Sequence, residues 1–383
     1  MAYPLHVRIL RFCLLLVLAS LALVIPSVAQ RTKPIFEQDL QSYGYKFQYA
    51  RDDRMQSFTD LAFLSDDLVL VSVKELYLDE LHPKILPSGT IMYDNPMGAR
   101  TPPTSLSTLL LFSLDQKKLV RSAKLPIRKM DGAVQATQNG HFLMLSSYGL
   151  HLCSAQLECG PPWPTEGPVY ISPQGIRAVV GGSRWSEQQL VDVDKFAVRE
   201  TFKSGPPTVI PGDVGLMLVG YQNTLVRMPG RKDLDVGFGG DVVSPRSRFL
   251  DHDKVIGIKM SGISEGKATA TKVDGTVLYQ IEVKDAWRHN VQLVSSASGL
   301  SFCVAELYYT RLNSMINFFD IGDNRDYNRA RIRVFEVSTG KQMLELNWDP
   351  REYRGEDTLP AISPSGHRLA VVRKGKLQVY AVP

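Results

Sequence analysis

The chain has 383 residues, of which 44% are hydrophobic and 22% are charged, with 29 glycines and 23 prolines. These proportions are those of a globular protein, and they exclude a collagen-like chain, a coiled coil, a disulfide-stapled mini-protein and a wholly disordered chain. The formal net charge is +5, and Arg8 and Arg11 near the N-terminus supply two of those charges. Basic and acidic residues are therefore nearly balanced, which disfavours nucleic acid as an obligatory partner.

Residues 1–29 have the pattern of a secretory signal peptide. Arg8 and Arg11 precede the apolar run Phe12–Ile25, and Ser27–Ala29 offers small side chains before a cut at Gln30. The run is shorter than the roughly 20 apolar residues that span a bilayer, which favours cleavage over a retained anchor. We therefore expect an exported protein, periplasmic or extracellular, with no membrane span after cleavage.

Three cysteines follow the leader, and in an exported protein their spacing can indicate a disulfide. Cys153 and Cys159 flank a short return between two extended segments, so an oxidising compartment favours a disulfide between them. Cys303 alternates with polar Ser301 in a strand-like run and is interpreted as a buried core thiol. A free reactive thiol is the alternative at Cys303.

Beyond the leader, one pattern of short strands recurs along the chain. A short strand, a turn rich in Ser, Pro, Gly and Asp, a very apolar strand, a second turn and an alternating strand make up the unit. The clearest copies are at 170–180 and 361–372. Weaker copies lie at 61–70, 136–144 and 293–302, and around 211–213 and 251–253. The spacing of the middle copies fits one four-stranded module each.

These units resemble the WD40-like β-propeller repeats of exported bacterial proteins, in which an SPDG-type turn precedes a hydrophobic strand. Ser172–Gly175 and Ser363–Gly366 carry the resemblance. It implies an all-β fold, a seven-bladed propeller in which each blade buries its faces against its neighbours.

We expect the propeller to be a single domain over residues 45–383, preceded by a lead-in at 30–44. Insertions are expected at about 74–105 in the first copy and 309–331 in the sixth. Long excursions from a rigid scaffold often carry recognition, although a tolerated surface loop is an equal alternative.

The last copy lacks its outer strand, which predicts how the ring closes. The segment before the chain end supplies three strands, ending with 377–382. We expect Tyr45–Tyr49 from the other end of the propeller to supply the fourth and to cover an edge that would otherwise aggregate.

Candidate binding residues come from the connections that lead into the innermost strands, at one mouth of the ring. Aromatic and arginine side chains gathered at such a mouth are typical of binding hot spots. The alternative is that these charged and aromatic residues only terminate strands. The candidates are Trp163, Trp287, Arg288, His289, Tyr353 and Arg354.

The sequence shows no catalytic constellation. Gly262–Gly266 matches the G-x-S-x-G pattern but joins two strand-like runs, so we interpret it as a hairpin rather than a nucleophile elbow. Asn324–Asn328 has the alternating oxygens of a calcium loop but lacks its glycine and distal glutamate. The histidines most alike in position, His141, His252 and His367, belong to three different copies, which disfavours a shared metal.

The sequence thus favours a non-catalytic binding or scaffold module without a cofactor, monomeric, with an unidentified protein or small ligand of the cell envelope as partner. The alternative is a propeller-channel enzyme of the lactonase or quinoprotein type. Its metal or quinone would lie at the carboxylates of the same mouth, namely Asp131, Glu166, Asp241 and Asp357.

Overall fold

The computed structural model describes residues 33–45, 55–77, 83–85, 91–93, 105–127, 134–146, 149–165, 169–181, 187–202, 208–220, 223–236, 247–260, 265–284, 289–309, 327–348, 360–373 and 375–383. The regular structure within them is antiparallel β-sheet, apart from two short 3-10 turns, η1 (Gln41–Tyr43) and η4 (Gln138–Gly140). No helix in this part of the chain is long and apolar enough to cross a membrane. The expected signal peptide, residues 1–29, lies outside the described residues.

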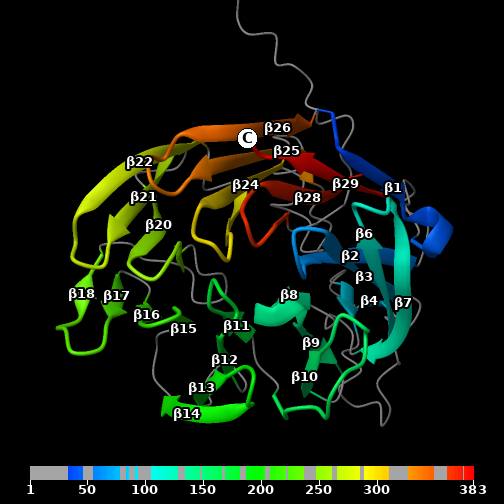
Figure 1. Cartoon of the computed structure of the whole chain (residues 1–383), viewed down its shortest axis with the longest axis horizontal. Helices are drawn as coiled ribbons and strands as arrows, with labels where there is room; N and C mark the ends of the chain where they lie inside the picture. Colours follow the sequence, from blue (N-terminus) through cyan, green and yellow to red (C-terminus); the bar gives the residue numbers. More distant parts are fainter. Residues whose placement is uncertain are drawn as a thin grey trace, which may run out of the picture. The chain divides into compact units, whose positions relative to one another are not determined.

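The unit Ile35–Pro383 is a seven-bladed β-propeller (Figure 1), as the repeats predict. We number the blades in chain order, and within each blade the strands run from the innermost to the outermost. Blade 1 is β2 (Met55–Phe63), β3 (Leu68–Tyr77), β6 (Ser105–Ser113) and β7 (Lys118–Ile127). Blade 2 is β8 (Val134–Ala136), β9 (Phe142–Ser146) and β10 (Gly149–Cys153). Blade 3 is β11 (Val169–Ile171), β12 (Arg177–Gly181), β13 (Gln188–Asp192) and β14 (Ala197–Phe202).

The remaining blades follow the same order. Blade 4 is β15 (Thr208–Pro211), β16 (Leu216–Val219), β17 (Thr224–Arg227) and β18 (Leu234–Asp235). Blade 5 is β19 (Ser247–Phe249), β20 (Lys254–Met260), β21 (Glu265–Lys272) and β22 (Val277–Lys284). Blade 6 is β23 (His289–Ser295), β24 (Ser301–Tyr309), β25 (Tyr327–Glu336) and β26 (Gln342–Trp348). Blade 7 is β27 (Ala361–Ile362), β28 (Arg368–Arg373), β29 (Lys376–Ala381) and β1 (Phe36–Asp39).

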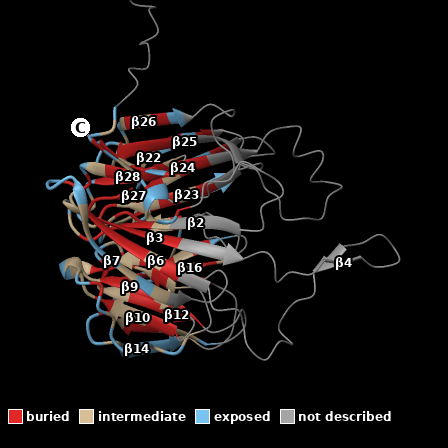
Figure 2. Ribbon diagram, turned by 90° about the vertical axis from the view of Figure 1, so that its right-hand side faces the viewer, coloured by how far each residue is buried: buried red, intermediate tan, exposed pale blue. Residues whose placement is uncertain are grey.

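The core lies between the blades. Among the described residues, a separate hydrophobic cluster fills each of the seven contacts between neighbouring blades, including the contact between blades 7 and 1. Second strands such as β12 and β16 are accordingly buried along most of their length, whereas the outermost strand β14 is exposed (Figure 2). A single blade would leave both faces in water, so the blades are stable only as neighbours in the ring.

This arrangement explains why the second strand of each repeat is so apolar. In β28, Leu369 and Val371 pack toward blade 6, whereas Ala370 and Val372 pack toward blade 1. A strand buried on both faces loses the alternation of polar and apolar residues that a half-exposed strand shows.

An N-terminal strand closes the ring, but the expected segment is wrong. The strand that pairs with β29 is β1, and Phe36 lies opposite Val379 while Asp39 lies opposite Lys376. Tyr45 is instead buried in the hydrophobic cluster between blades 7 and 1, and residues 46–49 lie outside the described residues. A four-residue outer strand with one buried apolar side chain carries no pattern that distinguishes it in the sequence.

Side chains reinforce this closure. Glu37 of β1 accepts hydrogen bonds from Lys376 Nζ at 2.8 Å and from Gln378 Nε2 at 2.7 Å, both on β29. Backbone bonds flank them, from Ile35 N–H to the carbonyl of Val379 and from Leu40 N–H to that of Gly375. The first and last described segments of the propeller are therefore held in one sheet.

The turns between the first and second strands contact each other around the ring. The Ser365 N–H of blade 7 donates to Asp66 Oδ1 of blade 1 at 3.0 Å. The Gln174 N–H of blade 3 donates to Asp213 Oδ1 of blade 4 at 3.1 Å. The Ser298 N–H of blade 6 donates to the Pro364 carbonyl of blade 7 at 2.9 Å. The SPDG-like turn thus reverses the chain and also forms hydrogen bonds between neighbouring blades.

Candidate functional site

The strand order places the long connections at one end of the ring. Because all strands within a blade are antiparallel, the connection that enters the first strand and the one between the second and third strands lie at the same end. We call this end the loop face. The turns between the first and second and between the third and fourth strands lie at the opposite end, the turn face.

Both expected insertions join a second strand to a third. In blade 1 the gap runs from the end of β3 at Tyr77 to the start of β6 at Ser105, and it contains the hairpin of β4 (Pro83–Ile85) and β5 (Ile91–Tyr93). In blade 6 the gap runs from the end of β24 at Tyr309 to the start of β25 at Tyr327. Both insertions therefore leave the ring at the loop face, together with the connections that supplied the candidate binding residues.

Two of the six candidate binding residues fall in the described part of the chain. Trp163 exchanges backbone hydrogen bonds with Leu150 of β10, at 2.7 and 2.9 Å, and its ring packs on Phe196 with centroids 5.8 Å apart. It therefore completes the outer edge of blade 2 and contributes to the core between blades 2 and 3. His289 is the first residue of β23, at the loop-face end of the innermost strand of blade 6.

The other candidates lie outside the described residues. These are Trp287, Arg288, Tyr353 and Arg354, and the carboxylates Asp131, Glu166, Asp241 and Asp357 of the enzyme alternative.

The G-x-S-x-G segment lies in a hairpin, as the sequence predicts. It connects β20 to β21, which are antiparallel with Met260 opposite Gly266. A nucleophile elbow requires a strand followed by a helix. Of the calcium-like segment, Tyr327 and Asn328 are described, and both belong to β25.

The predicted disulfide is present. Cys153 and Cys159 are bonded, and they link β10 to the segment that forms the outer edge of blade 2. Cys303 is fully buried, as expected, between blades 6 and 7. Burial raises the pKa of its thiol, so the reactive thiolate is disfavoured.

A group of polar side chains on the innermost strands was missed by the sequence analysis. Gln135 of blade 2 donates through Nε2 to the Val169 carbonyl of blade 3 at 3.3 Å. Tyr170 of blade 3 shares a hydrogen bond with Thr208 of blade 4 and interacts electrostatically with Arg248 of blade 5. We call Gln135, Tyr170, Thr208 and Arg248 the inner-strand cluster.

A positional signal for this cluster exists in the sequence. Gln135, Tyr170 and Arg248 each stand two residues before the first residue of the turn that ends the innermost strand. Aligning the copies on that turn would have put these polar residues in register. Apolar residues dominate the composition of the repeats around them.

The turn face carries a cavity of about 470 Å³ between blades 4 and 5. Its walls combine apolar and charged side chains from the turns of both blades: Val214, Met228, Pro229, Arg231, His252, Asp253, Lys272, Val273 and Asp274.

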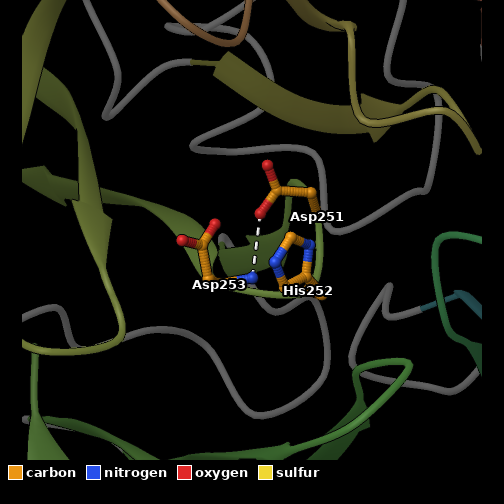
Figure 3. A group of neighbouring side chains, drawn as sticks. All are labelled: Asp251, His252 and Asp253. Carbon is orange, nitrogen blue, oxygen red and sulfur yellow. Dashed lines mark hydrogen bonds between the residues drawn. The ribbon is translucent and has the colours of Figure 1, made fainter.

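Asp251, His252 and Asp253 stand together at the edge of this cavity (Figure 3). Asp251 Oδ1 accepts the backbone N–H of Asp253 at 2.9 Å, and Lys254 Nζ lies 2.5 Å from Asp251 and 3.2 Å from Asp253. One lysine ammonium thus already pairs with both carboxylates. The cluster is an ion-paired turn, because a metal would have to displace that ammonium.

No known family has a sequence profile that matches this chain, and no curated protein matches it in sequence. Among solved structures it is similar to Kluyveromyces lactis Hsv2, with a TM-score of 0.48, 11% identity, and coverage of 84% of this chain and 91% of that chain. The WD40 domain of Toxoplasma gondii coronin has a TM-score of 0.48 and 9% identity, and the match covers 86% of this chain and 85% of that chain. BamB from Moraxella catarrhalis has a TM-score of 0.40 and 11% identity, and the match covers 84% of this chain and 95% of that chain. At this level the likeness concerns the propeller fold alone.

Proposed function

We propose that this protein is a non-catalytic, exported binding or scaffold module that engages a protein or small ligand of the cell envelope through its loop face. The supporting observation is the asymmetry of the ring. Both insertions start and end at the loop face, whereas the turn face consists of short turns that contact one another. A rigid scaffold that gathers its long connections on one side is the usual arrangement of a recognition surface.

Within this proposal, the binding side chains are Trp287, Arg288, His289, Tyr353 and Arg354, which belong to the connections into the innermost strands of blades 6 and 7. Aromatic and arginine side chains supply most of the energy at protein interfaces. The ring of Trp163 already packs on Phe196, so Trp163 supports the binding surface through packing and not through direct contact with the partner.

Export is part of the proposal. The leader at residues 1–29 supports it, and so does the disulfide between Cys153 and Cys159, because such bonds persist in oxidising compartments.

The test compares two variants in binding to a cell-envelope extract by affinity capture with quantitative mass spectrometry. Trp287→Ala with Arg288→Ala alters the loop face, and Arg231→Ala with Lys272→Ala alters the turn face as a matched control. A partner retained by the wild type and the control but lost from the loop-face variant supports the proposal.

Equal retention by both variants would contradict the loop face as the binding surface. Substrate turnover that the loop-face variant abolishes would contradict the non-catalytic role. Elemental analysis and an absorption spectrum of the purified protein test the metal or quinone of the enzyme alternative directly.

A further inference from the structure

The cavity between blades 4 and 5 follows from the lengths of the turns around it. In blade 4, a hydrogen bond of 2.8 Å from the Gly212 N–H to the Gly215 carbonyl closes the turn between the first and second strands. In blade 3 the equivalent bond joins the Ser172 N–H to the Arg177 carbonyl, so that turn is two residues longer, and blades 6 and 7 have turns of the longer kind. A short turn covers less of the neighbouring blade, and a space of about 470 Å³ lies beside it.

The walls that blade 4 contributes are apolar. Val214 is 44% exposed on its short turn, and Met228 and Pro229 belong to the turn between β17 and β18. Met228 also packs against the hydrophobic cluster between blades 4 and 5, and a Cβ atom at Gly215 would come within 2.3 Å of its sulfur. The apolar surface therefore continues from the core into the cavity. An apolar group seated there would remove that surface from water.

Basic side chains line the cavity from both blades. Arg231 belongs to the turn after β17 in blade 4, and Lys272 is the last residue of β21 in blade 5. A guanidinium presents parallel N–H donors that match the two oxygens of a carboxylate, and an ammonium adds a second positive charge. A carboxylate in the cavity can therefore interact with both blades.

Two acidic side chains also line the cavity, and each already has a donor within the chain. Asp253 Oδ1 lies 3.2 Å from Lys254 Nζ. Asp274 Oδ1 accepts the backbone N–H of Thr276 at 2.9 Å. A cationic ligand would have to share both carboxylates with donors that the chain holds in place. The cavity is therefore better suited to an anion than to a cation.

We propose that this cavity binds a small monocarboxylate with an apolar tail, of the kind of a medium-chain fatty acid. The tail packs on Val214, Met228 and Pro229. Arg231 and Lys272 bind the carboxylate. An apolar hollow with a few charged groups is the usual form of a small-molecule site. The cavity lies at the end of the ring opposite the loop face, so this inference goes beyond the proposed function and does not depend on it.

The experiment titrates octanoate, acetate and octylammonium separately into the full chain by isothermal titration calorimetry, at neutral pH and constant ionic strength. Acetate keeps the carboxylate without the tail, and octylammonium keeps the tail with the opposite charge. The variant is Arg231→Met, which removes one positive charge from the cavity. Lys232→Met is the matched control, because Lys232 is an exposed cation in the same turn and does not line the cavity.

We expect octanoate to bind the wild type in a one-to-one complex. Acetate and octylammonium should each bind at least about ten-fold more weakly, since the first loses the burial of the tail and the second loses the charged hydrogen bonds. Arg231→Met should bind octanoate about ten-fold more weakly than the wild type, because a charge-assisted pair is removed. Lys232→Met should bind octanoate as the wild type does.

The proposal is overturned by a wild type that does not bind octanoate, or that binds acetate or octylammonium as tightly as octanoate. Equal affinities of Arg231→Met and Lys232→Met for octanoate would also overturn it. A second variant, Val214→Asp, places a carboxylate on the exposed apolar wall and should abolish octanoate binding, so unchanged binding by Val214→Asp would exclude this cavity as the site. None of these results bears on the loop face, which is tested separately by capture of a cell-envelope partner.

Discussion

Gly175 of blade 3 lies directly against Thr137 of blade 2: a Cβ atom at residue 175 would come within 2.4 Å of the Thr137 Cα. Gly175 also has a φ of +72°, which L-residues with a side chain rarely adopt. The glycine of the SPDG-like turn is therefore required twice, by its backbone conformation and by the approach of the neighbouring blade.

Gly175→Ala should lower the free energy of unfolding by about 3 kcal/mol, because the left-handed conformation costs about 1–2 kcal/mol and the clash adds to it. Urea denaturation measures the loss. Gly230→Ala is the matched control, because Gly230 has a φ of +70° but a Cβ atom there would meet no other atom within 4 Å. It should lose only about 1 kcal/mol. Equal losses in the two variants would show that the contact between turns carries no energy.

Reduction of the Cys153–Cys159 disulfide should lower the free energy of unfolding by about 2 kcal/mol, as expected from the entropy of closing so short a loop. Denaturation with and without a reductant measures this difference. The stability of Cys153→Ala with Cys159→Ala should no longer depend on the reductant. A persistent effect in that double variant would assign the loss to another cause, such as the remaining thiol of Cys303.

Arg333→Met should destabilise the protein by about 3 kcal/mol, because it removes the nearer ion-pair partner of the buried Glu306 and leaves Arg331 at 4.0 Å. Adding Glu306→Leu to Arg333→Met should restore much of the loss, since a hydrophobic pair of similar volume replaces two buried charges. Denaturation of both variants gives the coupling energy. The idea fails if the double variant is less stable than Arg333→Met alone.

Acid should loosen the closing strand of the ring. Hydrogen bonds from Lys376 and Gln378 hold the pKa of Glu37 below its usual value of 4.5. Its contribution is therefore complete above that value and is lost as the pH falls through the lowered pKa of the folded state. The pair is partly exposed, so the contribution is at most about 1 kcal/mol.

Hydrogen exchange of the β1 amides measures this loosening, as an increase in opening when the pH is lowered from 6 to 3, after correction for intrinsic rates. Glu37→Gln should open more readily than the wild type at pH 6, and the difference between the two should shrink as the pH is lowered. A constant difference between them across this range would rule out titration of Glu37 as the cause.

The repeat is legible in the amino-acid pattern alone, and the repeat predicts the architecture. Modules such as 170–180 and 361–372 combine a turn with a strand that is apolar on both faces. Only stacking against neighbouring modules can bury both faces of that strand. The disulfide was also predictable, because its two cysteines flank a short turn between extended segments. These are local properties, set by composition and spacing along a few residues.

Which residues meet across the ring depends on the folded arrangement of the blades. Phe36–Asp39, rather than Tyr45–Tyr49, closes blade 7, because the pairing depends on backbone geometry and on the contacts of Glu37 with β29. The innermost strands likewise bring Gln135 of blade 2 to the Val169 carbonyl of blade 3, 34 positions further along the chain. Such contacts depend on how successive blades turn about a common axis, and a linear sequence does not record that rotation.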